Sequence, residues 1–290
     1  QIRGESLANV MPMADFIGFN VALGQVMMAA QSLANAWTNL VTIKPTYAQL
    51  DPIMKIESET VAGAEDPGDL QGEIEVANVH FRYDADGPLI LNGLTLTIEA
   101  GQHVAIVGAS GCGKSTLVRV LLGFEEIERG TVFLDGHDLR RLDKQAVRRN
   151  IGVVLQNGRL LTGSIFENIV AGASLTEEDA WDAVAAAGLE EDLKAMPMGM
   201  HTVLAEGAST ISGGQRQRLM IARAIVHKPR ILIFDEATSA LDNRTQAIVT
   251  SSLDAMQCTR ISIAHRLSTI RHADKIVVVD RGVVIEQNKI

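Results

Sequence analysis

The stretch GASGCGKST, at residues 108–116, constrains the fold of this chain more than any other. It fits the pattern G-x-x-x-x-G-K-[ST], follows a short apolar run at residues 103–107 and precedes a helix-like pattern that begins at Leu117. Glycines in such a loop let successive backbone N–H groups point inward, and the following helix adds the positive end of its dipole. The stretch therefore predicts a loop that binds the phosphates of a nucleotide.

The side chains of this loop have distinct chemical roles. Lys114 can reach the β- and γ-phosphates of a nucleoside triphosphate, and the hydroxyl group of Ser115 can ligate Mg²⁺. The backbone amides hold the remaining phosphate oxygens. We expect the nucleotide to contact Gly108, Ala109, Ser110, Gly111, Cys112, Gly113, Lys114, Ser115 and Thr116.

A second feature is a pair of carboxylates at the end of an apolar strand. Residues 231–234 read ILIF, and Asp235 and Glu236 follow directly. In a nucleotide site the first carboxylate can hold Mg²⁺ and the second can orient and deprotonate the attacking water. An ordinary sheet end explains such a pair equally well when it stands alone. The phosphate loop about 120 residues upstream favours the nucleotide interpretation.

Composition excludes some classes of function. The net charge is −9, and nucleic-acid surfaces need clustered Lys and Arg, so we expect no nucleic-acid partner. Cys112 and Cys258 fit neither a disulfide framework nor a metal site, which favours a reducing compartment. Because the chain begins at Gln1 without a signal-peptide pattern, we expect it to be a piece of something longer.

The N-terminal region is apolar. Residues 16–43 contain no charged side chain, and their number exceeds the roughly 20 that cross a bilayer as a helix. Polar and small residues interrupt the run, as they do in membrane helices that pack against other helices or line a wet cavity. A membrane helix is the prediction, and the core helix of a soluble domain remains the alternative.

Strands and helices alternate after residue 72. Strand patterns lie at residues 74–81, 94–98, 104–107, 131–134, 151–155, 231–234, 260–263 and 276–279, and helical patterns at 177–187, 213–227 and 245–256. Buried strands that alternate with helices form a parallel sheet covered on both faces. The predicted fold class is therefore α/β.

Residues 211–215 read ISGGQ and continue as RQRLMIARAI. This stretch resembles the signature sequence LSGGQ of ABC transporters, with Ile for Leu as the one difference, and the resemblance covers the chain from Gly72 to its end. Ser212, Gly213 and Gly214 at a helix N-terminus form a second anion cradle. The resemblance implies a dimer, because one chain has no second triphosphate to place there.

Further motifs of the family follow in order. The resemblance implies that Tyr83 stacks on adenine, Gln156 contacts Mg²⁺, Asp242 communicates between the two sites and His265 grips the γ-phosphate. Each alone has an ordinary explanation: a surface aromatic, a polar strand end, a helix N-cap and a satisfied histidine. Their ordered occurrence favours the family roles.

The family then implies a fold and a mechanism. The fold is a P-loop NTPase with a mixed sheet core, an antiparallel β subdomain and a helical subdomain at about residues 157–212, preceded by a partial transmembrane helix. Lys114 and its loop bind ATP with Mg²⁺, which Ser115, Gln156 and Asp235 ligate. Glu236 is the general base, and His265 assists. Ser212, Gly213, Gly214, Gln215 and Asp242 face the ATP of the opposing subunit.

Two features resemble those of ABC exporters: a membrane-like helix fused ahead of the ATPase, and the segment GSIFENI. The implied domains are the end of a transmembrane domain at residues 1–56, a linker at 57–71 and the nucleotide-binding domain at 72–290, on the cytoplasmic side of a bacterial inner membrane. More narrowly, NGRLLTGSIFENI, AMPMGMHTVLAEG and LDNRTQAIV resemble bacterial exporters of bacteriocin-like peptides with nitrile-hydratase-type leaders. A lipid or drug exporter and a soluble ABC ATPase remain alternatives. The resemblance also implies that the partner subunit is a second copy or a sister chain, and that the C-terminal helical tail usual in the family is missing from this sequence.

Overall fold

The computed structural model describes residues 12–54, 63–155, 158–205, 210–235, 242–264, 270 and 272–289. The chain divides into two units, Gln1–Glu59 and Thr60–Ile290, and each is described by itself.

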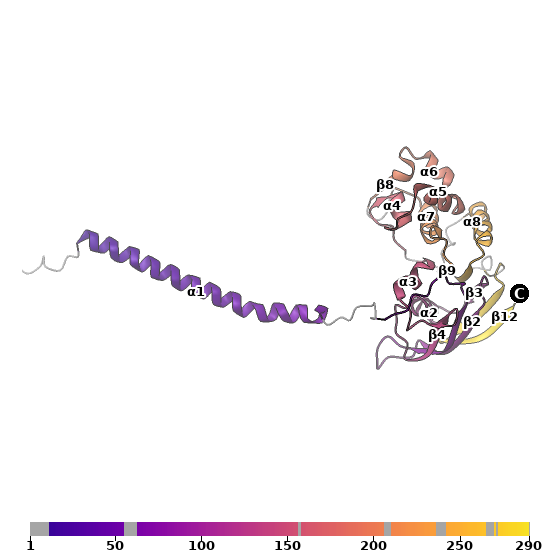
Figure 1. Ribbon diagram of the computed structural model, residues 1–290, viewed down its shortest axis with the longest axis horizontal. Helices are drawn as coiled ribbons and strands as arrows, with labels where there is room; N and C mark the ends of the chain where they lie inside the picture. The colour runs from indigo at the N-terminus through magenta and orange to yellow at the C-terminus, as the bar shows by residue number, and fades with distance from the viewer. Residues whose placement is uncertain are drawn as a thin grey trace, which may run out of the picture. The chain divides into compact units, whose positions relative to one another are not determined.

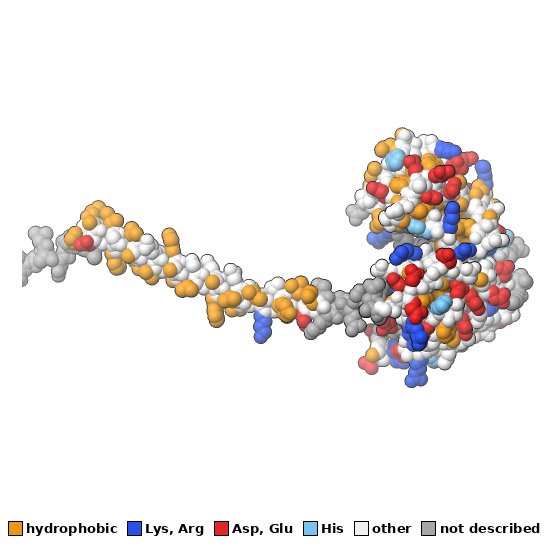
Figure 2. Space-filling view, viewed as in Figure 1, with side chains coloured by type: hydrophobic (Ala, Val, Ile, Leu, Met, Phe, Trp, Pro, Cys, Tyr) orange, Lys and Arg blue, Asp and Glu red, His pale blue; other side chains and the backbone are white. Residues whose placement is uncertain are grey.

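The first unit contains one long helix, α1 (Met13–Met54) (Figure 1). Its side chains are exposed along nearly the whole length, including Leu33 and Trp37, and Figure 2 shows hydrophobic side chains along it. The segment Met13–Pro52 is long and apolar enough to cross a membrane. Length and composition thus permit the predicted span, and the helix continues past Lys44, through Pro45.

The second unit is built on a six-stranded sheet among its described residues, in the order β12-β11-β3-β10-β9-β6. Five strands run parallel, and β12 pairs antiparallel with β11 at one edge. Their bounds are β3 (His103–Val107), β6 (Ile151–Val154), β9 (Ile231–Asp235), β10 (Thr259–Ile263), β11 (Lys275–Asp280) and β12 (Val283–Lys289).

Both faces of this sheet are covered, as β9 shows. Its residues are all buried, and Ile231 and Ile233 belong to one hydrophobic cluster whereas Leu232 and Phe234 belong to another. Because successive side chains of a strand point to opposite faces, the two clusters lie on the two sides of the sheet. This confirms the predicted parallel sheet buried on both faces.

A second sheet is antiparallel and has the order β2-β1-β4-β5. Its strands are β1 (Ile74–Phe81), β2 (Leu91–Ile98), β4 (Arg129–Leu134) and β5 (His137–Asp138). The inward residues of β1 and β2 join those of α2 (Lys114–Leu121) and β3 in the first cluster. The helix that follows the phosphate loop is therefore packed together with residues of both sheets.

A helical region covers the other face of the central sheet (Figure 1). It contains α4 (Ile165–Val170), α5 (Glu177–Ala186), α6 (Glu190–Ala195) and the 3-10 helix η1 (Gly199–His201), with the short pair β7 (Gly163–Ser164) and β8 (Val203–Leu204). Helices α7 (Gly213–Ile225) and α8 (Asn243–Ala255) contribute to the same cluster, and α3 (Lys144–Arg149) precedes β6. The predicted mixed core, antiparallel subdomain and helical subdomain are confirmed.

The sequence-based boundaries differ from the structure mainly by a few residues. The helix expected to begin at Leu117 begins at Lys114, because Gly113 caps it in a left-handed conformation. The short strands β5, β7 and β8 and the helix α6 were not predicted, because these parts of the sequence have no strong periodic signal. Part of the predicted linker is packed within the second unit, since Glu65 forms a β-bridge with Leu142 and Leu70 is buried. The domain boundaries stay predictions.

Candidate nucleotide-binding site

The predicted phosphate loop connects β3 to α2, at the carboxyl end of a central strand. Gly108 cannot carry a side chain there, because a Cβ atom would lie 2.1 Å from the carbonyl oxygen of Val279. Gly113 has φ +107 and directly precedes the helix, a conformation that glycine adopts at little cost. The glycines thus let the loop turn tightly against β11, with the first turn of α2 behind it.

Lys114 folds back into its own loop. Its ammonium group donates to the carbonyl oxygens of Gly108 and Ala109, at 2.9 Å each, and the side chain is buried. It also lies 3.7 Å from the sulfur of Cys112. A cation is thereby held inside the loop at the place where the family binds phosphate, although its contact with a phosphate stays a prediction.

Ser115 and Asp235 come together from distant parts of the sequence. The hydroxyl group of Ser115, in the first turn of α2, lies 3.4 Å from a carboxylate oxygen of Asp235, the last residue of β9. Mg²⁺ in nucleotide sites is held by one or two oxygen side chains together with phosphates and waters. The pair fits such an ion. No group of three or more His, Cys, Asp or Glu side chains that could hold a metal by itself occurs in the described ranges.

Tyr83 lies just beyond the end of β1, and its side chain is 54% exposed. Its hydroxyl group lies 3.2 Å from the hydroxyl group of Thr116, and its ring packs edge-on against Phe81 with 4.9 Å between ring centroids. The antiparallel sheet therefore places an aromatic ring beside the phosphate loop. Stacking of this ring on adenine stays a prediction.

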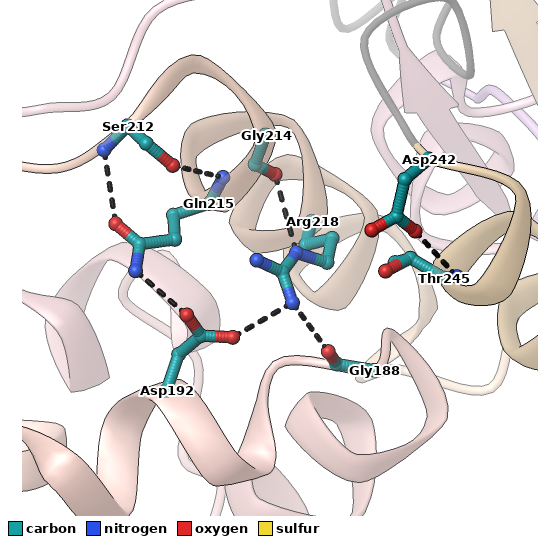
Figure 3. Close-up of polar contacts among 8 residues, drawn as sticks. All are labelled: Gly188, Asp192, Ser212, Gly214, Gln215, Arg218, Asp242 and Thr245. Carbon is teal, nitrogen blue, oxygen red and sulfur yellow. Dashed lines mark hydrogen bonds and ion pairs between the residues drawn. The ribbon is translucent and has the colours of Figure 1, made fainter.

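The predicted signature residues begin α7 (Figure 3). Ser212 is the N-cap: its side-chain oxygen accepts from the backbone N–H of Gln215, and the Gln215 side chain accepts from the backbone N–H of Ser212. Such a capping box stabilises the start of a helix. Ser212 and Gly213 are exposed at this helix end. The exposed N–H groups and helix dipole can attract an anion.

The side chain of Gln215 does not point outward with the cradle. It bonds to Ser212 and to Asp192 within the same chain. Its predicted contact with the ATP of an opposing subunit stays a prediction.

Asp242 is the N-cap of α8, and a carboxylate oxygen accepts from the backbone N–H of Thr245 at 2.7 Å. Hydrogen bonding from Thr245, first from its side chain and then from its backbone N–H, lowers the pKa of the Asp242 carboxyl, and the positive charge of Arg218 adds to the effect. The ordinary N-cap interpretation holds for this residue. A role facing the opposing subunit is compatible with it and stays a prediction.

Three predicted site residues lie outside the described residues: Gln156, Glu236 and His265. Their neighbours in sequence are described. Asp235 ends β9 directly before Glu236, and Ala264 follows β10 directly before His265. Strands β9 and β10 are neighbours in the sheet, so the chain leaves the same edge of the sheet at both places.

Sequence reasoning missed Asp192 and Arg218, which lie behind the signature helix. Their ion pair of 2.8 Å joins α6 to α7. An acidic residue in a first helical turn ordinarily faces the helix dipole, and nothing in its spacing indicated a partner 26 positions away.

The comparisons with known proteins agree with this geometry. A model of the ABC transporter family matches residues 91–239. The structure is similar to that of a bacterial Atm1-family ABC exporter with ATP bound, with a TM-score of 0.86 and 34% sequence identity over 95% of this chain and 49% of the other.

Two curated relatives are similar in sequence. The leukotoxin export ATP-binding protein LtxB of Aggregatibacter actinomycetemcomitans is 41% identical over 276 residues, which are 94% of this chain and 39% of the relative. The alpha-hemolysin translocation ATP-binding protein HlyB of Escherichia coli O157:H7 is 42% identical over 273 residues, which are 93% of this chain and 39% of the relative. The chain thus spans well under half the length of these relatives.

Proposed function

The chain belongs to the ABC transporter family and contains its ATPase domain, and from this premise we propose that it couples ATP hydrolysis to export across a bacterial inner membrane. The observation that carries the proposal is the meeting of Ser115 with Asp235 beside the loop that encloses Lys114. These groups supply what phosphoryl transfer needs from a protein: a cradle for the phosphates, a cation, and oxygen ligands for Mg²⁺.

Each residue has a step in the proposed reaction. The loop amides and Lys114 hold the β- and γ-phosphates. Ser115 and Asp235, with Gln156, would hold Mg²⁺, which would supply positive charge beside the phosphate oxygens. Glu236 orients a water molecule and takes its proton as the oxygen attacks the γ-phosphorus. The bond from the γ-phosphorus to the bridging oxygen breaks, which releases ADP and phosphate. His265 holds the γ-phosphate during this step.

The proposed unit of function is a dimer of ATPase domains. Ser212 and Gly213 are exposed at the N-terminus of α7 and can bind an anion that belongs to another chain. We assign that anion to the γ-phosphate of the ATP on a second subunit, either a copy of this chain or a sister chain. ATP binding then closes the dimer, and hydrolysis opens it.

Helix α1 is proposed to be the last helix of a transmembrane domain. Several of its polar side chains bond to the carbonyl oxygens of their own helix: Asn20 to Phe16, Ser32 to Met28 and Thr38 to Ala34. Polar groups that are satisfied within a helix enter lipid at a lower cost. The exposed apolar side chains then contact lipid or neighbouring membrane helices, and the ATPase domain lies in the cytoplasm.

The cargo is proposed to be a bacteriocin-like peptide with a nitrile-hydratase-type leader. Two observations support a polypeptide cargo: the loop sequences at residues 157–169, 195–207 and 241–249, and relatives named for export of a leukotoxin and translocation of alpha-hemolysin. The second candidate is a lipid or drug, which the Atm1-family likeness leaves open because the ATPase motifs are shared among exporters.

The test is ATPase activity of the full chain in lipid nanodiscs, with Lys114→Ala as the inactive control. Leader-bearing peptides encoded beside the gene are added one at a time. Saturable stimulation by one peptide is the expected result, and the same peptide without its leader should not stimulate. Turnover that responds to lipids or amphiphiles and to no peptide would replace the peptide assignment with the second candidate.

A further inference from the structure

Asp192 lies in the first turn of α6 and contacts the signature helix with both of its carboxylate oxygens. One oxygen accepts from the side-chain amide of Gln215 at 2.7 Å, and the other accepts from the guanidinium group of Arg218 at 2.8 Å (Figure 3). Arg218 and Asp192 are partly buried, with side-chain exposures of 14% and 30%. Hydrogen bonds between charged groups at such distances are the stronger ones in proteins.

The contact with Gln215 determines which way its amide faces. A carboxylate only accepts hydrogen bonds, so the NH₂ end of the amide must point at Asp192. The carbonyl end then points at Ser212, whose backbone N–H donates to it at 2.9 Å. Without Asp192 the amide can rotate, and the backbone N–H of Ser212 loses a fixed acceptor. A single carboxylate thus orients the capping box.

The contact with Arg218 fixes the helix behind the cradle. The same guanidinium group donates to the carbonyl oxygen of Gly188 at 2.6 Å and lies 3.4 Å from that of Gly214. Gly188 joins α5 to α6, whereas Gly214 belongs to the signature itself. Arg218 therefore connects the cradle to the loop between α5 and α6. The carboxylate of Asp192 holds the guanidinium group of Arg218 in place.

We propose that Asp192 is a positioning residue for the ATPase, because its bonds to Gln215 and Arg218 hold the Ser212 cradle in the geometry that meets the opposing nucleotide. This inference rests on the proposed dimeric function. In each nucleotide site of the proposed dimer, one subunit supplies the phosphate loop and the other supplies the Ser212 cradle. The inference gives the helical region a direct role in positioning that cradle. The phosphate loop of the same chain is not involved, since none of its residues contacts Asp192 among the contacts of the described residues.

The experiment compares Asp192→Ala, Asp192→Asn and Glu191→Ala in the full chain in nanodiscs. Glu191 is the matched control, because it is an exposed acidic residue of the same helical turn. The readouts are equilibrium ATP binding, ATPase rate against ATP concentration, and thermal melting. For Asp192→Ala we expect a turnover loss of about ten-fold, the effect of one or two charge-assisted hydrogen bonds. The ATP affinity of Asp192→Ala should stay within about two-fold of that of the wild type. The ATPase rate of Glu191→Ala should also stay within about two-fold of the wild-type rate.

The asparagine variant and a double-mutant cycle separate positioning from folding. Asp192→Asn has the same shape and keeps an acceptor for Gln215 but loses the ion pair, so we expect a smaller loss of turnover than for the alanine variant. In combination with Gln215→Ala, the loss caused by Asp192→Ala should shrink, since the two residues share one interaction. Additive losses would overturn the proposal, and so would losses that simply follow the melting temperature of each variant.

Ser212→Ala distinguishes failure of this inference from failure of the proposed function. If Ser212→Ala lowers turnover and Asp192→Ala does not, Asp192 has no positioning role although the dimeric ATPase stands. If neither the wild-type chain nor any variant hydrolyses ATP above the Lys114→Ala background, the proposed function fails together with the inference.

Discussion

The hydroxyl group of Ser115 lies 3.4 Å from the carboxylate of Asp235, a residue 120 positions further along the chain. Ser115 follows β3 and Asp235 ends β9, and these two parallel strands are separated in the sheet by β10 alone. Ligands of open α/β sheets bind at the carboxyl ends of the strands. The fold therefore brings together the predicted phosphate loop and a carboxylate that the sequence keeps far apart.

The first prediction concerns the response to Mg²⁺. Replacing Asp235 by Asn removes a negative charge beside the ion, so the Mg²⁺ concentration for half-maximal ATPase activity should rise about 10- to 100-fold. Asp138→Asn, which removes a half-buried carboxylate on β5 outside the site, is the control and should leave that concentration unchanged. Equal Mg²⁺ dependence in the wild type and Asp235→Asn would remove Asp235 from the metal site.

The second prediction concerns the fit of the phosphate loop against β11. In Gly108→Ala the added methyl group would meet the carbonyl oxygen of Val279 at 2.1 Å, so the free energy of unfolding should fall by about 3 kcal/mol, at the upper end of overpacking costs. Gly111 is the control: it has φ +78 and open space around it, so Gly111→Ala should cost only about 1 kcal/mol of backbone strain. Chemical denaturation followed through Trp181 fluorescence measures both. A similar loss in the two variants would contradict the packing argument.

The order of strands and helices could be predicted because local patterns specify it. The strand at residues 74–81 alternates, the run at 231–234 is continuously apolar, and both were predicted with boundaries within one residue of the structure. The conformation of the phosphate loop is determined locally by its glycines. These features depend on neighbours in sequence, which a sequence displays directly.

Contacts between distant elements could not be predicted in the same way. Asp192 meets Gln215 and Arg218 only because α6 packs beside the start of α7, and no spacing rule links positions 23 and 26 apart. The buried bonds of His103 to Ser262 and to the carbonyl group of His272 likewise depend on the order of strands in the sheet. Tertiary packing determines such pairs, and helix or strand propensity does not report it.

The third prediction uses His103 and pH. Burial, helped by the positive charge of Arg260, lowers the pKa of His103 below 6.5, while the nearby Asp274, Asp254 and the carbonyl group of His272 oppose the shift. Above pH 6.5 the ring is neutral in both the folded and the unfolded chain, so its contribution to stability is complete there. As the pH falls below 6.5, the unfolded chain binds a proton that the folded chain excludes, and stability declines.

The measurement is the free energy of unfolding between pH 7.5 and pH 5, about one unit above and one and a half units below an ordinary histidine pKa. The wild type should lose more stability over this interval than His103→Gln, which cannot titrate. Glutamine also keeps a donor and an acceptor, which limits the cost of the substitution at neutral pH. Parallel pH profiles of the two chains would show that His103 is not the titrating group.

The fourth prediction concerns Tyr83. If its ring stacks on adenine, Tyr83→Ala should weaken ATP binding about ten-fold, within the range of a base on an aromatic ring. Tyr83→Phe keeps the ring and loses only the hydroxyl contact with Thr116, so its ATP affinity should remain near that of the wild type. Titration calorimetry with ATP measures both. Equal weakening in the two variants would assign the effect to the hydroxyl group and not to stacking.

The central claim, that this chain hydrolyses ATP with Glu236 as the general base, is tested most directly with Glu236→Gln in the full chain in nanodiscs. ATP binding and phosphate release are measured on the same sample. The account predicts that the variant binds ATP as tightly as the wild type and that its phosphate release falls by at least about 10²-fold, the contribution of a general base. Near-normal phosphate release from Glu236→Gln would contradict it.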